Sequence, residues 1–227
     1  MKKQSGFTLI ELAIVLVIIG LLLGGVLKGQ ELINSAKVKN FASDFRNIPI
    51  YIYAYQDKYR ALPGDDSKAT TRGFGSVGAV NGNGNGALEG KWTDNLATTS
   101  EAYQFWQHVR LAALATGSTN AADADWRPTN ADGNPIGIQA GTNVVANSPI
   151  KDAAGNAIRG SYIICSQGVL GKYVSQLDVT MDDGNSSTGS MLAAVNPGGT
   201  PGMSLAPSGT TALPIDPAAS YIVCFGV

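Results

Sequence analysis

Few side chains in this sequence have a type and spacing that could carry out enzymatic chemistry. His108 is the only histidine, and it stands beside Trp106, where a hydrogen-bonded packing role is the usual one. The sequence contains no serine–histidine–aspartate set, no cysteine–histidine pair, no phosphate-binding loop and no zinc-ligand spacing. These observations predict a protein that is not an enzyme.

The most unusual ionisable residue is Glu11, because it lies inside an apolar run at residues 7–27. A helix of that length spans about 30 Å, the thickness of the hydrocarbon core of a bilayer. The run is too long for a secretory signal and continues into further helical sequence, so we expect it to be retained. An acidic side chain in a spanning helix is costly without a partner, and we expect Glu11 to have none in the monomer. A passive carboxylate that reaches the membrane surface is the alternative.

Glycines recur at four-residue spacing along the same run. The pairs are Gly20 with Gly24 and Gly25 with Gly29. Such pairs give a helix a flat face for close packing, and they also weaken the helix locally. Helix packing and ordinary membrane-helix glycines are both open interpretations.

Side-chain oxygens at alternate positions mark a second candidate site, at residues 81–86. Asn81, Asn83 and Asn85 alternate with glycines, and Glu89 follows. Hard cations are bound by loops with oxygen ligands at this kind of interval. The segment lacks aspartates and the spacing of an EF-hand, so a flexible loop is the favoured interpretation.

Cys165 and Cys224 are the only cysteines, and they close two nearly identical segments, SYIIC and SYIVC. Each segment has the composition of a strand that places its cysteine on the same face as its serine and the isoleucine two positions before the cysteine. A bridge between them would close a loop of about 60 residues and stabilise the fold by roughly 4 kcal/mol. Two buried free thiols are the alternative.

The charge balance argues against nucleic acid as a partner. Lysine and arginine number 16 against 17 aspartates and glutamates, and no basic cluster occurs. Phosphate binding requires clustered positive charge. After the apolar run the chain is rich in glycine, alanine, serine, threonine and asparagine, as loop-rich extracytoplasmic domains are.

A helical pattern continues beyond the apolar run. Apolar residues recur at three- and four-residue spacing from Leu32 to Tyr59, and Leu62-Pro63-Gly64 ends the pattern. Pro49 lies inside it and is expected to bend the helix without ending it. The sequence therefore predicts one helix of roughly 80 Å, part in the membrane and part against a head.

The remainder predicts a small antiparallel sheet with long loops, so the fold class is α+β. A capping box formed by Thr98 and Glu101 predicts a second helix that ends near Gly117. Strands are expected at residues 161–165, 177–181 and 220–224, with loops and short strands at 118–159.

The N-terminus resembles that of type IV prepilins and type II secretion pseudopilins. Lys2 and Lys3 form a short basic leader, Gly6 ends it, and FTLIE follows at residues 7–11. The resemblance covers about the first 40 residues. It implies that a prepilin peptidase cuts between Gly6 and Phe7 and methylates Phe7. It also implies that Glu11 pairs with the amino terminus of a neighbouring subunit during filament assembly.

The resemblance also implies an organisation for the whole chain. The expected parts are a leader at 1–6, a pilin helix at 7–62 that spans the membrane at about 7–27, and a globular head at 63–227. The subunit would lie in the bacterial inner membrane with its head in the periplasm, and then enter a pilus or a pseudopilus. The implied partners are copies of itself or other pilins, prepilin peptidase, the inner-membrane assembly machinery and the lipid bilayer.

Two further expectations depend on this placement. A head outside the cytoplasm favours the bridge between Cys165 and Cys224. The Asp-Asp-Gly segment resembles the tail of pseudopilins, where carboxylates can hold calcium, so Asp178, Asp182 and Asp183 are candidate ligands, with a plain turn favoured. The alternative function is a membrane-tethered extracytoplasmic domain with ligand-binding, adhesive or enzymatic activity.

One feature departs from the pilin pattern. Many pilins have a proline near the end of the apolar run, whereas this chain has Gly24-Gly25 there and its first proline is Pro49. The position at which the helix bends in a filament is therefore not given by the resemblance.

Overall fold

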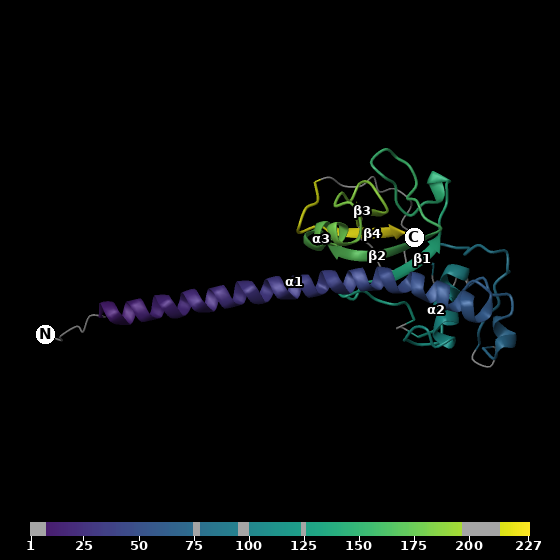
Figure 1. Ribbon diagram of the computed structural model, residues 1–227, viewed down its shortest axis with the longest axis horizontal. Helices are drawn as coiled ribbons and strands as arrows, with labels where there is room; N and C mark the ends of the chain where they lie inside the picture. The colour runs from purple at the N-terminus through teal and green to yellow at the C-terminus, as the bar shows by residue number, and fades with distance from the viewer. Residues whose placement is uncertain (1–7, 75–77, 95–99, 124–125, 197–213) are drawn as a thin grey trace.

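A long helix with a head near its C-terminal end makes up the structure, a computed structural model that describes residues 8–74, 78–94, 100–123, 126–196 and 214–227 (Figure 1). The helices are α1 (Leu9–Tyr59), α2 (Glu101–Leu111) and α3 (Gly171–Met181). The strands are β1 (Ile136–Ala140), β2 (Tyr162–Leu170), β3 (Met191–Val195) and β4 (Ser220–Gly226). Short 3-10 helices lie at η1 (Ala69–Arg72) and η3 (Val145–Asn147). The predicted pilin-like α+β fold is confirmed.

Helix α1 has well-defined ends and no interruption. The Thr8 hydroxyl caps its first turn, and Arg60 ends it in a left-handed conformation with a φ of 53°. Its 51 residues correspond to a length of about 77 Å. The helix runs through Pro49, so the prediction that this proline does not end it is confirmed.

Only the C-terminal half of α1 is buried. The N-terminal half extends away from the head, as Figure 1 shows. The buried side chains lie three or four residues apart, which places them on one face of the helix. They are Val38, Phe41, Ala42, Phe45, Ile48, Ile52 and Tyr55.

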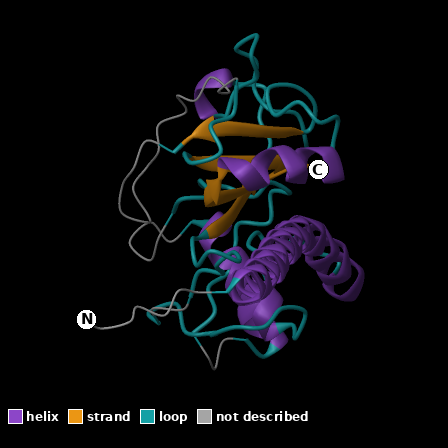
Figure 2. Ribbon diagram, turned by 90° about the vertical axis from the view of Figure 1, so that its left-hand side faces the viewer, coloured by secondary structure: helices purple, strands orange, loops and turns teal. Residues whose placement is uncertain are grey.

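The sheet has the order β1-β2-β4-β3, and all neighbouring strands are antiparallel. Successive side chains point to opposite faces. Ile164 and Val223 belong to the core shared with α1 and α3. Ile163 and Ile222 belong to a second cluster, which Trp92 and residues of the 150–158 segment cover on the other face. Figure 2 shows α3 lying across the sheet. The sheet is thus covered on both faces.

The predicted strand at residues 177–181 is wrong, because this segment is the end of helix α3. After Gly171 at its start, its buried residues are Tyr173, Val174, Leu177 and Asp178, which lie on one side of a helix. Val179 is 71% exposed, so the apparent alternation of apolar residues does not correspond to a buried strand face.

The second predicted helix exists and begins at Glu101, but its predicted cap and its predicted C-terminal end are wrong. Its N-cap is Ser100, whose hydroxyl oxygen accepts a hydrogen bond from the Tyr103 main-chain N–H. Thr98 lies outside the described residues. The helix ends at Leu111, since Ala113 takes a positive φ of 60° before Gly117 is reached.

Candidate assembly site

Glu11 lies in the first turn of α1, where Thr8 binds its carboxylate. Oε2 of Glu11 accepts hydrogen bonds from the Thr8 main-chain N–H at 2.8 Å and from the Thr8 hydroxyl at 2.7 Å. The Glu11 N–H donates in return to the Thr8 hydroxyl oxygen, which completes a capping box. The expectation that this carboxylate has no partner in the monomer is therefore wrong. Gly6 and Phe7 lie outside the described residues.

The N-terminal half of α1 exposes almost all of its apolar side chains. Leu9 is 89% exposed, Leu21 is 73% and Leu27 is 66%. Among the described residues, α1 is the one helix with the length and apolar composition needed to cross a membrane. Such a surface is unfavourable in water and requires either lipid or other apolar helices around it.

The four glycines of α1 lie on this uncovered surface. A Cβ added at Gly20, Gly24, Gly25 or Gly29 would meet no atom within 4 Å outside its own helix. The structure therefore shows no packing of these glycine positions against another described part of the chain. Their predicted role in helix packing stays a prediction.

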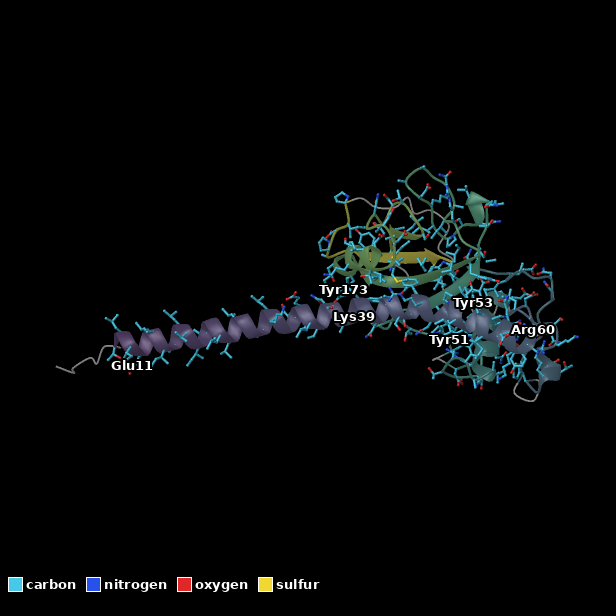
Figure 3. All side chains as sticks on the ribbon, viewed as in Figure 1. Glu11, Lys39, Tyr51, Tyr53, Arg60 and Tyr173 are labelled. Atoms are coloured by element: carbon cyan, nitrogen blue, oxygen red, sulfur yellow. A yellow bond between two sulfur atoms is a disulfide. The ribbon has the colours of Figure 1, made fainter. Side chains whose placement is uncertain are left out.

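Polar contacts fix the rotation of α1 relative to the head where the helix leaves its exposed half. Lys37 forms an ion pair with Asp132. The hydrogen bond within this pair raises the pKa of the Lys37 ammonium group. The Tyr173 hydroxyl of α3 donates to the Asn34 side-chain oxygen at 3.2 Å. The ring of Tyr173 also packs on Phe41, with 5.9 Å between centroids. Figure 3 shows Tyr173 at this junction. Movement of the head is thus coupled to the exposed helix.

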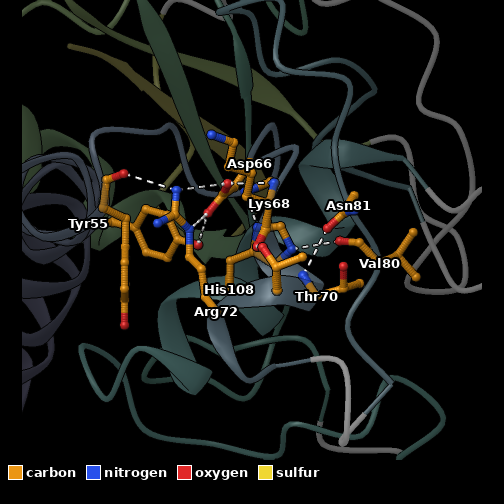
Figure 4. Close-up of polar contacts among 11 residues, drawn as sticks. Tyr55, Asp66, Lys68, Thr70, Arg72, Val80, Asn81 and His108 are labelled. Atoms are coloured by element: carbon orange, nitrogen blue, oxygen red, sulfur yellow. Dashed lines mark hydrogen bonds and ion pairs between the residues drawn. The ribbon is translucent and has the colours of Figure 1, made fainter.

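Asp66 forms a polar centre at the other end of the head (Figure 4). Its carboxylate accepts hydrogen bonds from Arg72 Nε at 2.5 Å, from the Tyr55 hydroxyl at 2.8 Å and from the Lys68 N–H at 2.9 Å. Burial alone would raise the pKa of Asp66, but these donors, with Arg72 foremost, hold it below its usual value. Asp66 therefore fastens the segment after α1 to the helix end.

His108 is a buried packing residue, as predicted. Its side chain has no exposed surface, and its Nδ1 accepts a hydrogen bond from the Gly64 N–H at 2.9 Å. Nε2 then carries the proton and donates to the Val80 carbonyl oxygen at 2.9 Å (Figure 4). Burial lowers the pKa of this imidazole. Both ring nitrogens are bonded to main-chain groups, so neither is free for proton transfer to a substrate.

The predicted bridge between Cys165 and Cys224 is confirmed. The two residues lie opposite each other on β2 and β4, and both are completely buried. The bridge lies on the sheet face away from α1, in the cluster with Trp92 and Leu192. It joins the two central strands of the sheet.

Asp178, Asp182 and Asp183 are brought together at the end of α3. One side-chain oxygen of each lies within 4.8 Å of the others. Asp178 is completely buried; its Oδ1 accepts from the Gly184 N–H at 2.7 Å, whereas Oδ2 is buried and has no hydrogen-bond partner among the described residues. Burial raises the pKa of Asp178 to about 6. The arrangement suits either a protonated carboxyl group or a bound cation.

The other two carboxylates also organise the turn. Asp182 accepts from the N–H groups of Ser190 and Met191, and Asp183 accepts from the Asn185 N–H and the Thr188 hydroxyl. Each aspartate thus has a structural role whether or not a cation is present.

The asparagine oxygens of residues 81–86 do not converge on one point. They accept hydrogen bonds from three different main-chain N–H groups, those of Thr70, Asn85 and Ala87. The segment is also attached to the head through Asp65 and Glu101. The segment therefore matches neither interpretation of the sequence, the cation-binding loop or the flexible loop. It is a loop held by hydrogen bonds to the head.

Sequence reasoning missed Thr8 and Asp65. A signal for Thr8 was present, because Thr-x-x-Glu at residues 8–11 is the pattern of a capping box. Asp65 gave no such signal, since its partners are distant in sequence: it accepts from the N–H groups of Gly84 and Gly86.

Comparison with known proteins places the recognisable part of the sequence at its N-terminus. No curated protein and no solved structure gives a significant match. Residues 1–27 match the family model of the prokaryotic N-terminal methylation motif. The chain therefore carries, ahead of a head of pilin-like fold, the N-terminal methylation motif that marks type IV prepilin- and pseudopilin-like proteins.

Proposed function

We propose that this protein is a structural subunit of a type IV pilus or a type II secretion pseudopilus. A prepilin peptidase cuts it between Gly6 and Phe7 and methylates Phe7. The head lies in the periplasm while α1 holds the subunit in the inner membrane, and the subunit then assembles through α1. The observation that carries the proposal is the exposed apolar N-terminal half of α1. Much of this half lies within the methylation motif at residues 1–27.

Assembly accounts for features that anchoring alone does not require. A simple tether needs only an apolar span, whereas this helix carries Glu11 near its start and four glycines on its surface. The helix is also continuous into the head and bonded to it through Lys37 and Asn34. A neighbouring helix packed on α1 would therefore set the position of the head as well.

The buried state of His108 counts against the alternative of a tethered enzyme. Its nitrogens are both bonded to main-chain groups, and it has no exposed surface. Catalysis by this residue would require the head to open. We therefore propose a structural role for this protein and not an enzymatic one.

Processing at Gly6 is the first test. Replacing Gly6 by leucine is expected to leave the chain uncut, because a bulky side chain would stand beside the bond that the peptidase must reach. Gly6→Ala is the matched control and should be cut more efficiently than the leucine variant. N-terminal mass spectrometry of membrane-extracted protein should find a methylated Phe7 in the wild type. A wild-type chain that begins at Met1, or beyond Leu27, would disprove the proposed processing.

We also propose that the aspartates at the end of α3 bind calcium. The support is the buried Oδ2 of Asp178, close to the carboxylates of Asp182 and Asp183; within the described part of the chain it has no hydrogen-bond partner. Oxygen ligands of this kind are what calcium prefers in proteins. The cation would join the end of α3 to the turn before β3.

Calcium is therefore expected to stabilise the full-length protein in detergent. A ligand at a hundredfold excess over its Kd stabilises the folded state by about 2.7 kcal/mol, which corresponds to a shift of roughly 5–10 °C here. Asp183→Asn should reduce this shift, because it removes one exposed charged ligand. Asp57→Asn, at an exposed position on α1, should keep it. Thermal unfolding with calcium and with chelator measures the shift, and its absence at millimolar calcium would contradict the proposal.

A further inference from the structure

Residues 81–86 contain three successive Asn-Gly steps, which are chemically labile. In such a step the glycine nitrogen attacks Cγ of the preceding asparagine, because glycine has no Cβ to hinder the approach. The new C–N bond closes a succinimide ring, and the side-chain amide leaves as ammonia with the proton of the attacking N–H. Water then opens the ring to aspartate or isoaspartate. The net reaction consumes one water molecule and needs no other reactant.

The attacking groups of the last two steps are held by one buried carboxylate. Asp65 is 3% exposed. Its Oδ1 accepts a hydrogen bond from the Gly84 N–H at 2.5 Å, and its Oδ2 accepts from the Gly86 N–H at 2.7 Å. A negative acceptor opposes the loss of a proton from the N–H group that it binds. Both glycine nitrogens are thus kept in their unreactive form.

The side chains under attack are held as well. Glu89 accepts hydrogen bonds from the amide nitrogens of Asn83 at 3.0 Å and Asn85 at 2.8 Å. Their carbonyl oxygens accept from the N–H groups of Asn85 and Ala87, two residues further on. The nitrogen and the oxygen of each side-chain amide are thus both hydrogen-bonded. The amide cannot rotate freely toward the neighbouring glycine nitrogen.

The first of the three Asn-Gly pairs, Asn81-Gly82, is held differently and serves as an internal reference for the rates of the other two. The Gly82 N–H donates to the main-chain carbonyl oxygen of Asp66 at 3.0 Å, not to a carboxylate. Oδ1 of Asn81 accepts from the Thr70 N–H. A neutral acceptor raises the barrier to proton loss less than a charged one does.

We propose that Asn83 and Asn85 are latent deamidation sites and that Asp65 keeps them unreactive while the segment is docked on the head. Each conversion adds a negative charge to a segment that is already bonded to Glu89 and lies against Asp65 and Glu101. Repulsion among these carboxylates would oppose renewed docking. The reaction would thus mark, irreversibly, a head that has opened at this end.

Deamidation of each asparagine can be followed by peptide mass spectrometry of the full-length protein in detergent. Asp65→Asn keeps the shape of the side chain but removes its charge. We expect it to accelerate deamidation of Asn83 and Asn85 about tenfold or more, since a hydrogen bond to a charged group is lost at each site. Asn81 should accelerate less, and the matched control Asp57→Asn should change none of the three rates.

A comparison within the wild type tests the same proposal if Asp65→Asn fails to fold. In urea the three asparagines should react at similar rates, whereas in the native protein Asn83 and Asn85 should be slowed more than Asn81. Equal slowing of all three in the native wild type would overturn the assignment to Asp65. So would equal acceleration of all three in a folded Asp65→Asn variant.

Discussion

Glu11→Val is expected to leave membrane insertion and the fold of the head intact while removing the protein from filaments. Glu11 is distant from the head, so its loss does not affect the core. In a filament its carboxylate would lie beside the amino terminus of Phe7 on a neighbouring subunit. Desolvation offsets much of the attraction within such a pair, so we expect the pair to act mainly on register. A subunit slipped by one position would leave two unpaired charges in an apolar surrounding.

The measurement is the ratio of sheared or pelleted filament protein to membrane-retained protein, in cells without the wild-type subunit. Glu11→Gln separates two roles, because glutamine can still accept a hydrogen bond from Thr8 but carries no charge. We expect both variants to be absent from filaments. Glu31→Val is the matched control, since Glu31 is exposed beyond the span and forms an exposed ion pair with Lys28. Normal incorporation of Glu11→Val would show that the carboxylate is a passive interfacial residue.

Replacing both Cys165 and Cys224 by alanine is expected to lower the free energy of unfolding by about 4 kcal/mol. The bridge joins residues 59 apart in sequence, and in the unfolded chain it removes much of the freedom of this long loop. The change corresponds to a fall of roughly 10 °C in the unfolding midpoint. The effect should be concentrated on β2 and β4, because the bridge joins these two central strands of the sheet.

Thermal and denaturant unfolding of the full-length protein in detergent measure this loss. A reducing agent should destabilise the wild type by a similar amount and leave the double alanine variant unchanged. Mass spectrometry of non-reduced peptides should show the linked pair in protein taken from the periplasmic face. Free thiols there would contradict the bridge, and a loss below about 1 kcal/mol would contradict its expected contribution to stability.

The long helix and the two paired strands could be predicted because their signals are local. The apolar run and the three- and four-residue spacing after it describe α1 without reference to the head. The segments SYIIC and SYIVC have strong strand composition and each ends in a cysteine, and they form the centre of the sheet. Strong local preference and tertiary structure agree in these elements.

Helix α3 could not be read in the same way. Leu177, Val179 and Met181 alternate as in a strand, and five residues are too few to distinguish a period of two from one of 3.6. The segment becomes a helix because Tyr173, Val174 and Leu177 together pack against the core shared with α1. Only the full segment from Gly171 to Met181, considered together with its contacts to α1, shows the helical pattern.

The buried carboxylates are the part of the head furthest from prediction. Asp65 and Glu101 accept hydrogen bonds from main-chain N–H groups of residues 83–86 and of Glu89. Their partners are main-chain groups 12 to 21 residues away, so no side-chain pattern marks them. Such roles follow from how the loop folds back on the head, which residue types alone do not specify.

Mass spectrometry of the intact chain in sheared filaments tests the central claim most directly, because it reports processing and assembly together. Filaments from cells that express the wild-type protein should contain this chain, beginning at Phe7 with a methylated amino terminus. A chain that remains in the membrane fraction with Met1 in place, while filaments assemble without it, would contradict the proposal that this protein is a filament subunit.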